Sequence, residues 1–229
     1  MMILMDLKLF FWVVLSIWTR DNELDRHFEA HRQADWQYMR TVTAAGEWYS
    51  EHGDILVNYY IKSPDKLAIV SRDQSAQRIT KGLVTWESAT WTEKTPVVFD
   101  RERTIAFNQL WYFGSPLWSI REELEKKADI QVDNYLCAWY QYKTEELVYD
   151  YFIRKKDHLL YGVSISDQEG EQLVSRKVLK YEQFGPFSLP SQISIVTPTS
   201  KDQYIFVEYA IGDLVKEEWF AYPEENKKP

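Results

Sequence analysis

Cysteine is almost absent from this chain: Cys137 is the only one in 229 residues. A single thiol cannot form an intrachain disulfide, and it excludes a metal cluster held by several cysteines. Glycine and proline are also scarce, at eight each, while 45% of the residues are hydrophobic. This composition is typical of a globular protein and not of a disordered one. The length allows one domain or two small ones, and no repeat or change in composition marks a second domain.

Positive charge is in short supply as well. The formal net charge is −8, and the isoelectric point is near 5.1. A nucleic-acid partner would require a basic surface that neutralises phosphates, so this charge balance excludes nucleic-acid binding. The net negative charge also disfavours permanent adsorption of the protein to anionic membranes.

The sequence has no long hydrophobic stretch. Its longest apolar run covers residues 9–18 near the N-terminus; as a helix this run would extend about 15 Å, half of a bilayer core. It resembles the apolar region of a secretory signal peptide, although no small-residue cleavage site precedes Asp21. Residues 1–20 are therefore predicted to be a signal peptide, with an uncleaved membrane anchor or a buried N-terminal helix as alternatives. The remainder, 21–229, is predicted to be a single domain.

Catalytic motifs are missing too. The sequence contains no G-x-S-x-G, phosphate loop or dinucleotide fingerprint. His27 and His31 have a spacing that metal ligands use, and Asp35 follows on the same helix side, but no third histidine accompanies them. We therefore predict no enzyme activity, no metal and no cofactor.

Aromatic residues are abundant. The chain has 10 Trp, 15 Tyr and 11 Phe, which together make up 16% of its residues. Such side chains are enriched in strands and provide wide, rigid contact surfaces. They indicate either an aromatic core or a surface that binds an apolar ligand.

The first part of the chain combines a helix with several strands. Asp21 or Asn22 can cap a helix that extends to about residue 40. From residue 42 to residue 87 the pattern changes to strands separated by turns at 52–54 and 63–66, and residues 77–87 form one continuous strand-like run. Within 55–61, residues 55, 57, 59 and 61 are apolar and share one face, so the sheet has one apolar face.

The second part contains helices followed by more strands. Asp100 can cap a helix that extends to about residue 113, and Ser115 with Pro116 can begin a second one that extends to about residue 128. From residue 130 onward the pattern is again strand-like. The fold class is therefore α+β: a strongly curved antiparallel sheet, an incomplete β-barrel of about 11 strands, with N-terminal and mid-chain helices covering its concave face.

Several short motifs allow a comparison with a known family. They are "YYIKSPDKLAIV" at 59–70, "KGLVTW" at 81–86 with Pro96 after it, and "YIFVEYAIGDLVKEEWFAYP" at 204–223. In this order, after an N-terminal helix, they resemble the LolA-like family of bacterial lipoprotein carriers and lipoprotein-sorting proteins. The resemblance covers nearly the whole chain after residue 21. In one respect the sequence differs: carriers of this family commonly have an arginine just before the hairpin proline, whereas this chain has Ser63.

The resemblance implies an apolar cavity that binds acyl chains beneath a helical cover. The side chains predicted to line it, for each of which ordinary core packing is the alternative, are Tyr59, Ile61, Leu67, Ile69, Trp111, Phe113, Leu117, Trp118, Tyr149, Tyr151, Ile193, Ile195, Val207 and Tyr209. The predicted function is non-covalent binding and transport of a lipid or lipoprotein acyl group in the periplasm.

Other classes of function stay open at this stage. The same scaffold with a filled core could serve as a periplasmic sensor or an envelope-assembly protein. The "GEW" at 46–48 also resembles the Gly-x-Trp of lipocalin first strands, but the long preceding helix and the mid-chain helices disfavour a lipocalin. The predicted partners are lipid or lipoprotein acyl chains, with a membrane donor and an acceptor protein, and the chain is predicted to be a monomer.

Overall fold

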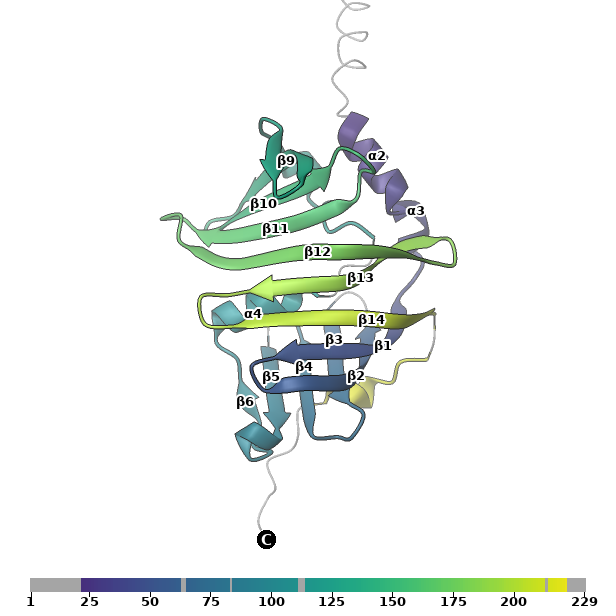
Figure 1. The fold of residues 1–229 in the computed structure, drawn as a ribbon, viewed down its shortest axis with the longest axis vertical. Helices are drawn as coiled ribbons and strands as arrows, with labels where there is room; N and C mark the ends of the chain where they lie inside the picture. Colours follow the sequence, from purple (N-terminus) through teal and green to yellow (C-terminus); the bar gives the residue numbers. More distant parts are fainter. Residues whose placement is uncertain (1–21, 63–64, 83, 111–113, 213, 222–229) are drawn as a thin grey trace, which may run out of the picture.

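A single antiparallel sheet dominates the fold (Figure 1). The computed structural model describes residues 22–62, 65–82, 84–110, 114–212 and 214–221. The strands are β1 (Thr41–Ser50), β2 (Gly53–Lys62), β3 (Lys66–Ser71), β4 (Ala76–Lys81), β5 (Val84–Ala89), β6 (Val97–Val98), β7 (Glu125–Lys126), β8 (Ile130–Val132), β9 (Tyr135–Lys143), β10 (Leu147–Arg154), β11 (Leu160–Asp167), β12 (Gln172–Phe184), β13 (Phe187–Val196) and β14 (Lys201–Ile211). The α-helices are α2 (Asn22–Ala30), α3 (Gln33–Trp36) and α4 (Arg101–Asn108), and the 3-10 helices are η1 (Thr90–Thr92), η2 (Arg121–Glu123) and η3 (Glu217–Phe220).

Neighbouring strands in the sheet are mostly neighbours in the chain. The order is β6-β5-β4-β3-β2-β1-β14-β13-β12-β11-β10-β9-β7, and β8 pairs with β9. Hairpins therefore build two halves, β1–β6 and β7–β14, which meet where β1 pairs with β14. Among the described residues no pairing joins the two outer ends, so the sheet is an unclosed barrel. The predicted fold class is confirmed: β6, β7 and β8 are short, and the other strands number eleven.

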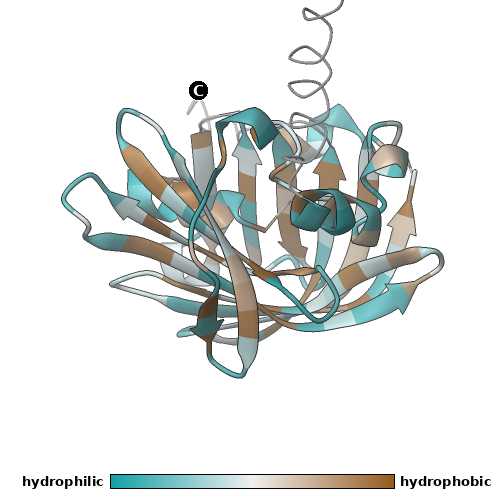
Figure 2. Ribbon diagram, turned by 90° about the horizontal axis from the view of Figure 1, so that it is seen from above, coloured by the Kyte–Doolittle hydropathy of each residue, from teal (hydrophilic) through white to brown (hydrophobic). Residues whose placement is uncertain are grey.

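The sheet curves strongly (Figure 2). Helix α4 contacts β4 and β5 in one half and β12 in the other. Since five strands separate β4 from β12 in the sheet order, α4 must lie on the inner, concave side. The main core lies there, with Tyr59, Tyr151 and Ile193 from the sheet and Phe28 from α2 all buried in one cluster. The alternation predicted for 55–61 is confirmed, because Val57, Tyr59 and Ile61 are buried in this core.

The helices differ in part from the prediction. The first helix is interrupted at Arg32, which adopts the left-handed conformation (φ 52°), and helical structure ends at Trp36. Asp100 does cap α4, accepting a hydrogen bond from the Arg103 N–H at 2.8 Å. None of the described helices is long and apolar enough to span a membrane.

The second mid-chain helix, predicted for about 115–128, is wrong. The Ser115 hydroxyl accepts from the Leu117 N–H at 3.1 Å, but this cap leads into turns, η2 and then strand β7. Contacts with α2 hold the segment instead: Trp118 packs edge-on against Phe28 with ring centroids 4.9 Å apart. Tertiary contacts thus outweigh the local helical preference.

The run at 77–87 is two strands and not one. The turn between β4 and β5 begins at Gly82, whose φ of +62° suits a residue without a side chain. Outside this hairpin, on the convex face, residues of β3, β4 and β5 form a second, smaller core with Val215 and Phe220. The large apolar side chains of β4 and β5, Ile79 and Trp86, therefore face the convex side.

Candidate functional site: a polar pocket on the concave face

Strands β4 and β5 turn polar side chains toward the concave side. Paired residues on adjacent strands share a face, and β4 pairs Thr80 with Leu67 and Arg78 with Ile69. Leu67 and Ile69 belong to the main core, so Arg78 and Thr80 face it as well. Glu87 joins them on this face because it pairs with Arg78. The apolar Ile79 and Trp86 point to the convex side.

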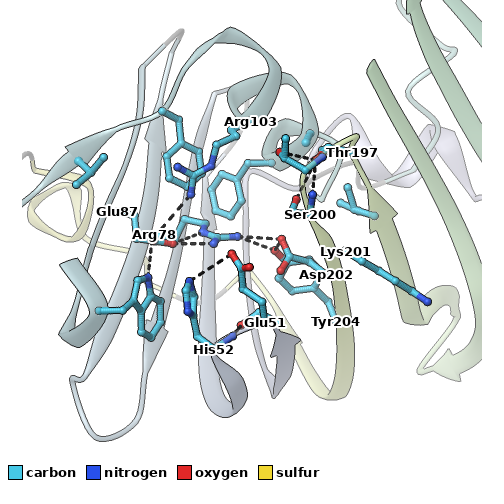
Figure 3. A pocket seen from close by; sticks show the side chains of 18 of the residues that line it. Glu51, His52, Arg78, Glu87, Arg103, Thr197, Ser200, Lys201, Asp202 and Tyr204 are labelled. Carbon is cyan, nitrogen blue, oxygen red and sulfur yellow. Dashed lines mark hydrogen bonds and ion pairs between the residues drawn. The ribbon is translucent and has the colours of Figure 1, made fainter. Parts of the chain in front are cut away.

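Arg78 is the centre of a buried charge network (Figure 3). Its side chain is only 8% exposed, and its Nε and Nη2 atoms donate to Glu87 Oε2 at 2.8 and 2.6 Å. Its Nη1 donates to the Tyr204 hydroxyl at 3.1 Å and to Asp202 Oδ2 at 3.3 Å. Three strands separate β4 from β14 in the sheet, so this network reaches across the concave face from one half of the sheet to the other.

Further donors complete the network. The indole N–H groups of Trp48 and Trp91 donate to Asp202 Oδ1 at 3.1 Å and to Glu87 Oε1 at 2.9 Å. Arg103 of α4 lies 4.0 Å from Glu87 Oε1. Two guanidinium groups thus balance two carboxylates, as buried charges require.

The ionisation of the network follows from this geometry. Burial alone would lower the pKa of Arg78, but the negative charges of Asp202 and Glu87 outweigh it and raise that pKa. Burial raises the pKa of Tyr204, which therefore stays a neutral donor and acceptor. The Arg78 guanidinium also lies over the Trp48 ring at 4.1 Å, where a cation–π contact adds to its stabilisation.

A cavity of about 660 Å³ opens above this network. Its walls come from the β1–β2 turn, η1, α4 and the β13–β14 turn, and Phe99, Ala106, Phe107 and Ile195 form an apolar side. The volume is in the range of ligand pockets. A second cavity of about 410 Å³ shares His52 and Trp91 with it; these two rings stack with centroids 4.3 Å apart.

Most predicted cavity residues lie together on the concave face. Those buried in the main core are Tyr59, Ile61, Leu67, Ile69, Leu117, Tyr151, Ile193 and Ile195, and Tyr149 and Tyr209 pack against it. Only Ile195 among them also lines the larger cavity. Their contact with a ligand stays a prediction. Trp111, Phe113 and Ser63 lie outside the described residues.

Two predicted positions do not lie inside. Val207 is 65% exposed, because Ala45 pairs with Glu208 and Gly46 with Phe206, which leaves Val207 as the extra residue of a β-bulge. The bulge shifts the alternation, so that Tyr204 and Phe206 face inward before it and Tyr209 after it. Placing Val207 on the inner face was therefore wrong. Trp118 is 46% exposed, with one edge against Phe28.

The charged residues of the site were missed by the sequence analysis. The usable signal was strand pairing: across the turn at 72–75, Arg78 and Thr80 pair with the apolar Ile69 and Leu67, and across the turn at Gly82, Glu87 pairs with Arg78. The apolar Ile79 and Trp86 hid this signal, because they suggest the opposite face. Asp202 carried no comparable signal, since its distance to β4 depends on the curvature of the whole sheet.

His27 and His31 form hydrogen bonds with other parts of the fold. No group of three potential metal ligands occurs among the described residues. His27 instead contacts the Ser115 hydroxyl and the His158 carbonyl, and His31 accepts the Leu160 N–H. Both rings are buried.

Comparison with known proteins identifies the fold. No protein-family model matches the chain, and the curated proteins give no match. Solved structures do match. One is an outer membrane lipoprotein-sorting protein domain from Vibrio parahaemolyticus (TM-score 0.56, 10% identity, 87% of this chain and 97% of that one). Another is a LolA superfamily protein from Nitrosomonas europaea (TM-score 0.55, 10% identity, 87% of this chain and 96% of that one).

A third similar structure is a DUF1329 family protein from Desulfovibrio piger (TM-score 0.54, 11% identity, 86% of this chain and 96% of that one). All three similarities extend over most of both chains, although only 10–11% of the aligned residues are identical. What is shared is the path of the backbone: an unclosed, curved antiparallel sheet with helices on its concave side. The chain therefore has a LolA-like fold.

Proposed function

We propose that this protein binds a lipid or a lipoprotein acyl chain without covalent chemistry and carries it through the periplasm. The observation that supports this most directly is the apolar concave face of an unclosed sheet, which helical segments cover. Removing a methylene group from water contributes about 0.8 kcal/mol, so a long acyl chain gains much by entering such a space. The site needs no nucleophile or acid–base pair for this work.

The cavity above Arg78 is the proposed starting point for the ligand. Its apolar side, formed by Phe99, Ala106, Phe107 and Ile195, continues into the main core. Deeper binding would require the covering segments to move, because the chain's own side chains fill the rest of the concave face in the described structure. A carrier that must also release its ligand benefits from such a barrier.

Export and partners belong to the same proposal. Residues 1–20 would direct the chain to the periplasm, or anchor it to the membrane if they are retained. A carrier acts between a donor and an acceptor, so we expect one membrane protein that loads it and one that unloads it. The domain 21–229 would act as a monomer.

One observation favours a second candidate, a periplasmic sensor or assembly protein. The inner face is well filled: Trp48, Tyr59 and Tyr204 are each at most 1% exposed. The charge network at the cavity floor also satisfies itself without a ligand. A scaffold that recognises another protein would need no empty cavity.

Lipid extraction separates the two candidates. The protein would be purified without detergent from its native compartment, and organic extracts would be analysed by mass spectrometry. The double variant Ala106→Trp/Ile195→Trp fills the cavity, and Val207→Trp adds an equal side chain on the convex side as its control. A carrier should yield a stoichiometric lipid from the wild type and from Val207→Trp, and much less from the double variant. Folded protein without lipid in all three would argue for the sensor or assembly role.

A further inference from the structure

Three of the chain's four histidines meet at one place in the fold. His27 and His31 lie on α2 or directly after it, and His158 lies in the β10–β11 turn. The fourth, His52, is in the β1–β2 turn beside the cavity. The three-histidine cluster lies where α2 docks on the sheet, so histidine chemistry is concentrated at the joint between a helix and the strands.

The docked piece has two parts that hold each other. We call residues 22–36 and 114–121 together the cover. The Gln33 side-chain carbonyl accepts from the Ser115 N–H at 2.6 Å, and Arg121 forms an ion pair with Asp25 at 2.7 Å. Phe28 and Trp118 add the ring contact described above. The two parts can therefore be expected to move as one.

His27 connects both parts of the cover to the sheet. Its ring is completely buried; Nδ1 lies 2.7 Å from the His158 carbonyl oxygen, and Nε2 lies 2.6 Å from the Ser115 hydroxyl oxygen. A carbonyl can only accept, so Nδ1 carries the hydrogen and Nε2 accepts the hydroxyl hydrogen. A proton added to Nε2 would turn this acceptor into a donor, so the Ser115 hydroxyl would have to give up its bond and turn around, and a positive charge would lie on a completely buried ring.

His31 makes a second bond of the same kind. Its Nε2 accepts from the Leu160 backbone N–H at 3.2 Å. A protonated ring would present two facing N–H donors there. Both histidines are therefore in their neutral form when the cover is docked.

We propose that protonation of His27 and His31 releases the cover from the sheet, so that the cover opens on acidification and gives access to the concave face. The proposed function supplies only the purpose of this release, which is access for a ligand. The two acceptor nitrogens and their buried partners carry it without reference to a ligand. Histidine clusters at movable joints are a recognised form of pH switch.

The charged surroundings support the direction of this switch. From α2, Glu23 faces His158 and Lys155, with distances of 2.6 and 3.5 Å. Strand β10 supplies Arg154, which pairs with Asp157 of the β10–β11 turn, and β12 supplies Arg176 and Tyr181. The nearest groups to His31 are thus mostly cationic or neutral, and they disfavour a further positive charge.

The pKa values have the matching sign. Burial, the largest cause, lowers the pKa of His27 from 6.5 to about 4. Burial, followed by repulsion from His27 when that ring is protonated and from Arg176 and Arg154, lowers the pKa of His31 well below its usual value. A histidine with a depressed pKa in the closed state takes up a proton on opening, so opening becomes more favourable as the pH falls below 6.5. From pH 7 to pH 4, His27 alone should raise the opening constant about 100-fold.

Hydrogen–deuterium exchange tests the proposal without any ligand. Exchange of peptides 22–36 and 114–121 would be followed from pH 7 to pH 4 and corrected for the pH dependence of intrinsic exchange. We expect these peptides to lose protection on acidification while peptides of β13 and β14 keep theirs. Constant protection of the cover, or simultaneous loss in the sheet, would overturn the proposal.

Matched variants assign the effect to the two rings. Glutamine can accept and donate at the same positions without titrating, so His27→Gln/His31→Gln should keep the cover closed at pH 4. His52→Gln removes a histidine away from the joint and should behave like the wild type. Ser115→Ala, which removes a hydrogen-bonding partner but leaves both histidines, should be more open at pH 7 and still respond to pH. A normal pH response in the double variant would refute the assignment.

The outcomes also distinguish this inference from the proposed function. If the cover opens as expected but the lipid extracts are empty, the histidine switch stands and the carrier role fails. If lipid is found but the cover does not respond to pH, the carrier role stands and the switch fails.

Discussion

At the residue scale, Arg78 shows how a charged side chain can be placed inside an apolar core. Each of its three nitrogens has an acceptor, and its charge is balanced by Glu87 and Asp202. Buried ion pairs add little to stability over apolar packing, but they are costly to leave incomplete. The network can therefore form only when the sheet has this curvature, which brings β14 within reach of β4.

Removing Arg78 alone should be strongly destabilising. Arg78→Met leaves two carboxylates buried without their cation, so we expect the free energy of unfolding to fall by roughly 3–5 kcal/mol. Urea denaturation followed by circular dichroism measures this. The neutral triple variant Arg78→Met/Glu87→Gln/Asp202→Asn should recover much of the loss.

The control for this prediction is a surface ion pair. Arg101 and Glu146 are paired in the open, with both side chains well exposed. Arg101→Met should leave the unfolding free energy nearly unchanged, since exposed pairs contribute little. Equal losses of unfolding free energy in Arg78→Met and Arg101→Met would mean that the buried network contributes no more to stability than an exposed ion pair.

Cys137 provides a second prediction at this scale. The residue is buried in β9, and burial raises the pKa of its thiol to about 11. At pH 8 only about one thiol in a thousand would be the reactive thiolate. Iodoacetamide should therefore label native protein very slowly and urea-unfolded protein quickly, as mass spectrometry can show. Leu136 is the preceding residue and its side chain is exposed. As a control, the variant Cys137→Ser/Leu136→Cys should therefore be labelled quickly in the native state.

At the scale of the element, alternation predicted the strands well and their faces only in part. In β2 every second residue is apolar, and the prediction of its inner face is confirmed. In β4 and β5 the apolar residues Ile79 and Trp86 face outward, against the small convex core, while Arg78 and Glu87 face inward. A pattern states which residues share a face, but not which face is covered by the larger core.

The helices show the same limit. The Asp100 cap is a local signal, and it was read correctly. The cap at Ser115 was equally good locally, but its side chain bonds to His27 of α2 and the following residues pack on Phe28. No local pattern contains such contacts, because they join segments more than 80 residues apart.

Cap removal tests the contribution of α4. Asp100→Ala deletes the acceptor for the Arg103 N–H, and we expect a loss of about 1 kcal/mol in the free energy of unfolding. Asp100→Asn keeps an acceptor oxygen and should lose much less. Thermal or urea denaturation of the three proteins gives the comparison; identical stabilities would show that the cap is dispensable because packing alone fixes α4.

At the scale of the whole molecule, the curved sheet could be predicted and its charged site could not. The count of strands and the short turns lead to an antiparallel sheet that must curl. The site, in contrast, joins β4, β5, β14 and α4 across the arc, and Arg78 and Asp202 are 124 residues apart in the chain. Only the degree of curvature decides whether they meet, and curvature depends on bulges and packing that act together.

Gly46 allows the two halves of the sheet to approach closely where β1 pairs with β14. A Cβ atom at this position would lie 1.8 Å from the Ile205 carbonyl oxygen, at the bulge that exposes Val207. Gly46→Ala should therefore force β1 and β14 apart and cost about 3 kcal/mol of unfolding free energy, at the upper end of overpacking costs. Ala45→Val, one residue earlier on the convex side, should have a small effect. Equal effects of the two substitutions would contradict the role of the close approach.

The same pairing determines when the molecule can finish folding. Val42 pairs with Ile211, so β1 waits for a strand that follows it at a long distance in the sequence. Each half can form its hairpins early, but β1 keeps an open edge until β14 arrives, and pairing over such a separation is slow. A newly made chain thus cannot complete the sheet before β14 has been synthesised. For a protein that we propose is exported, this delay leaves time for transport before the sheet becomes too stable to unravel.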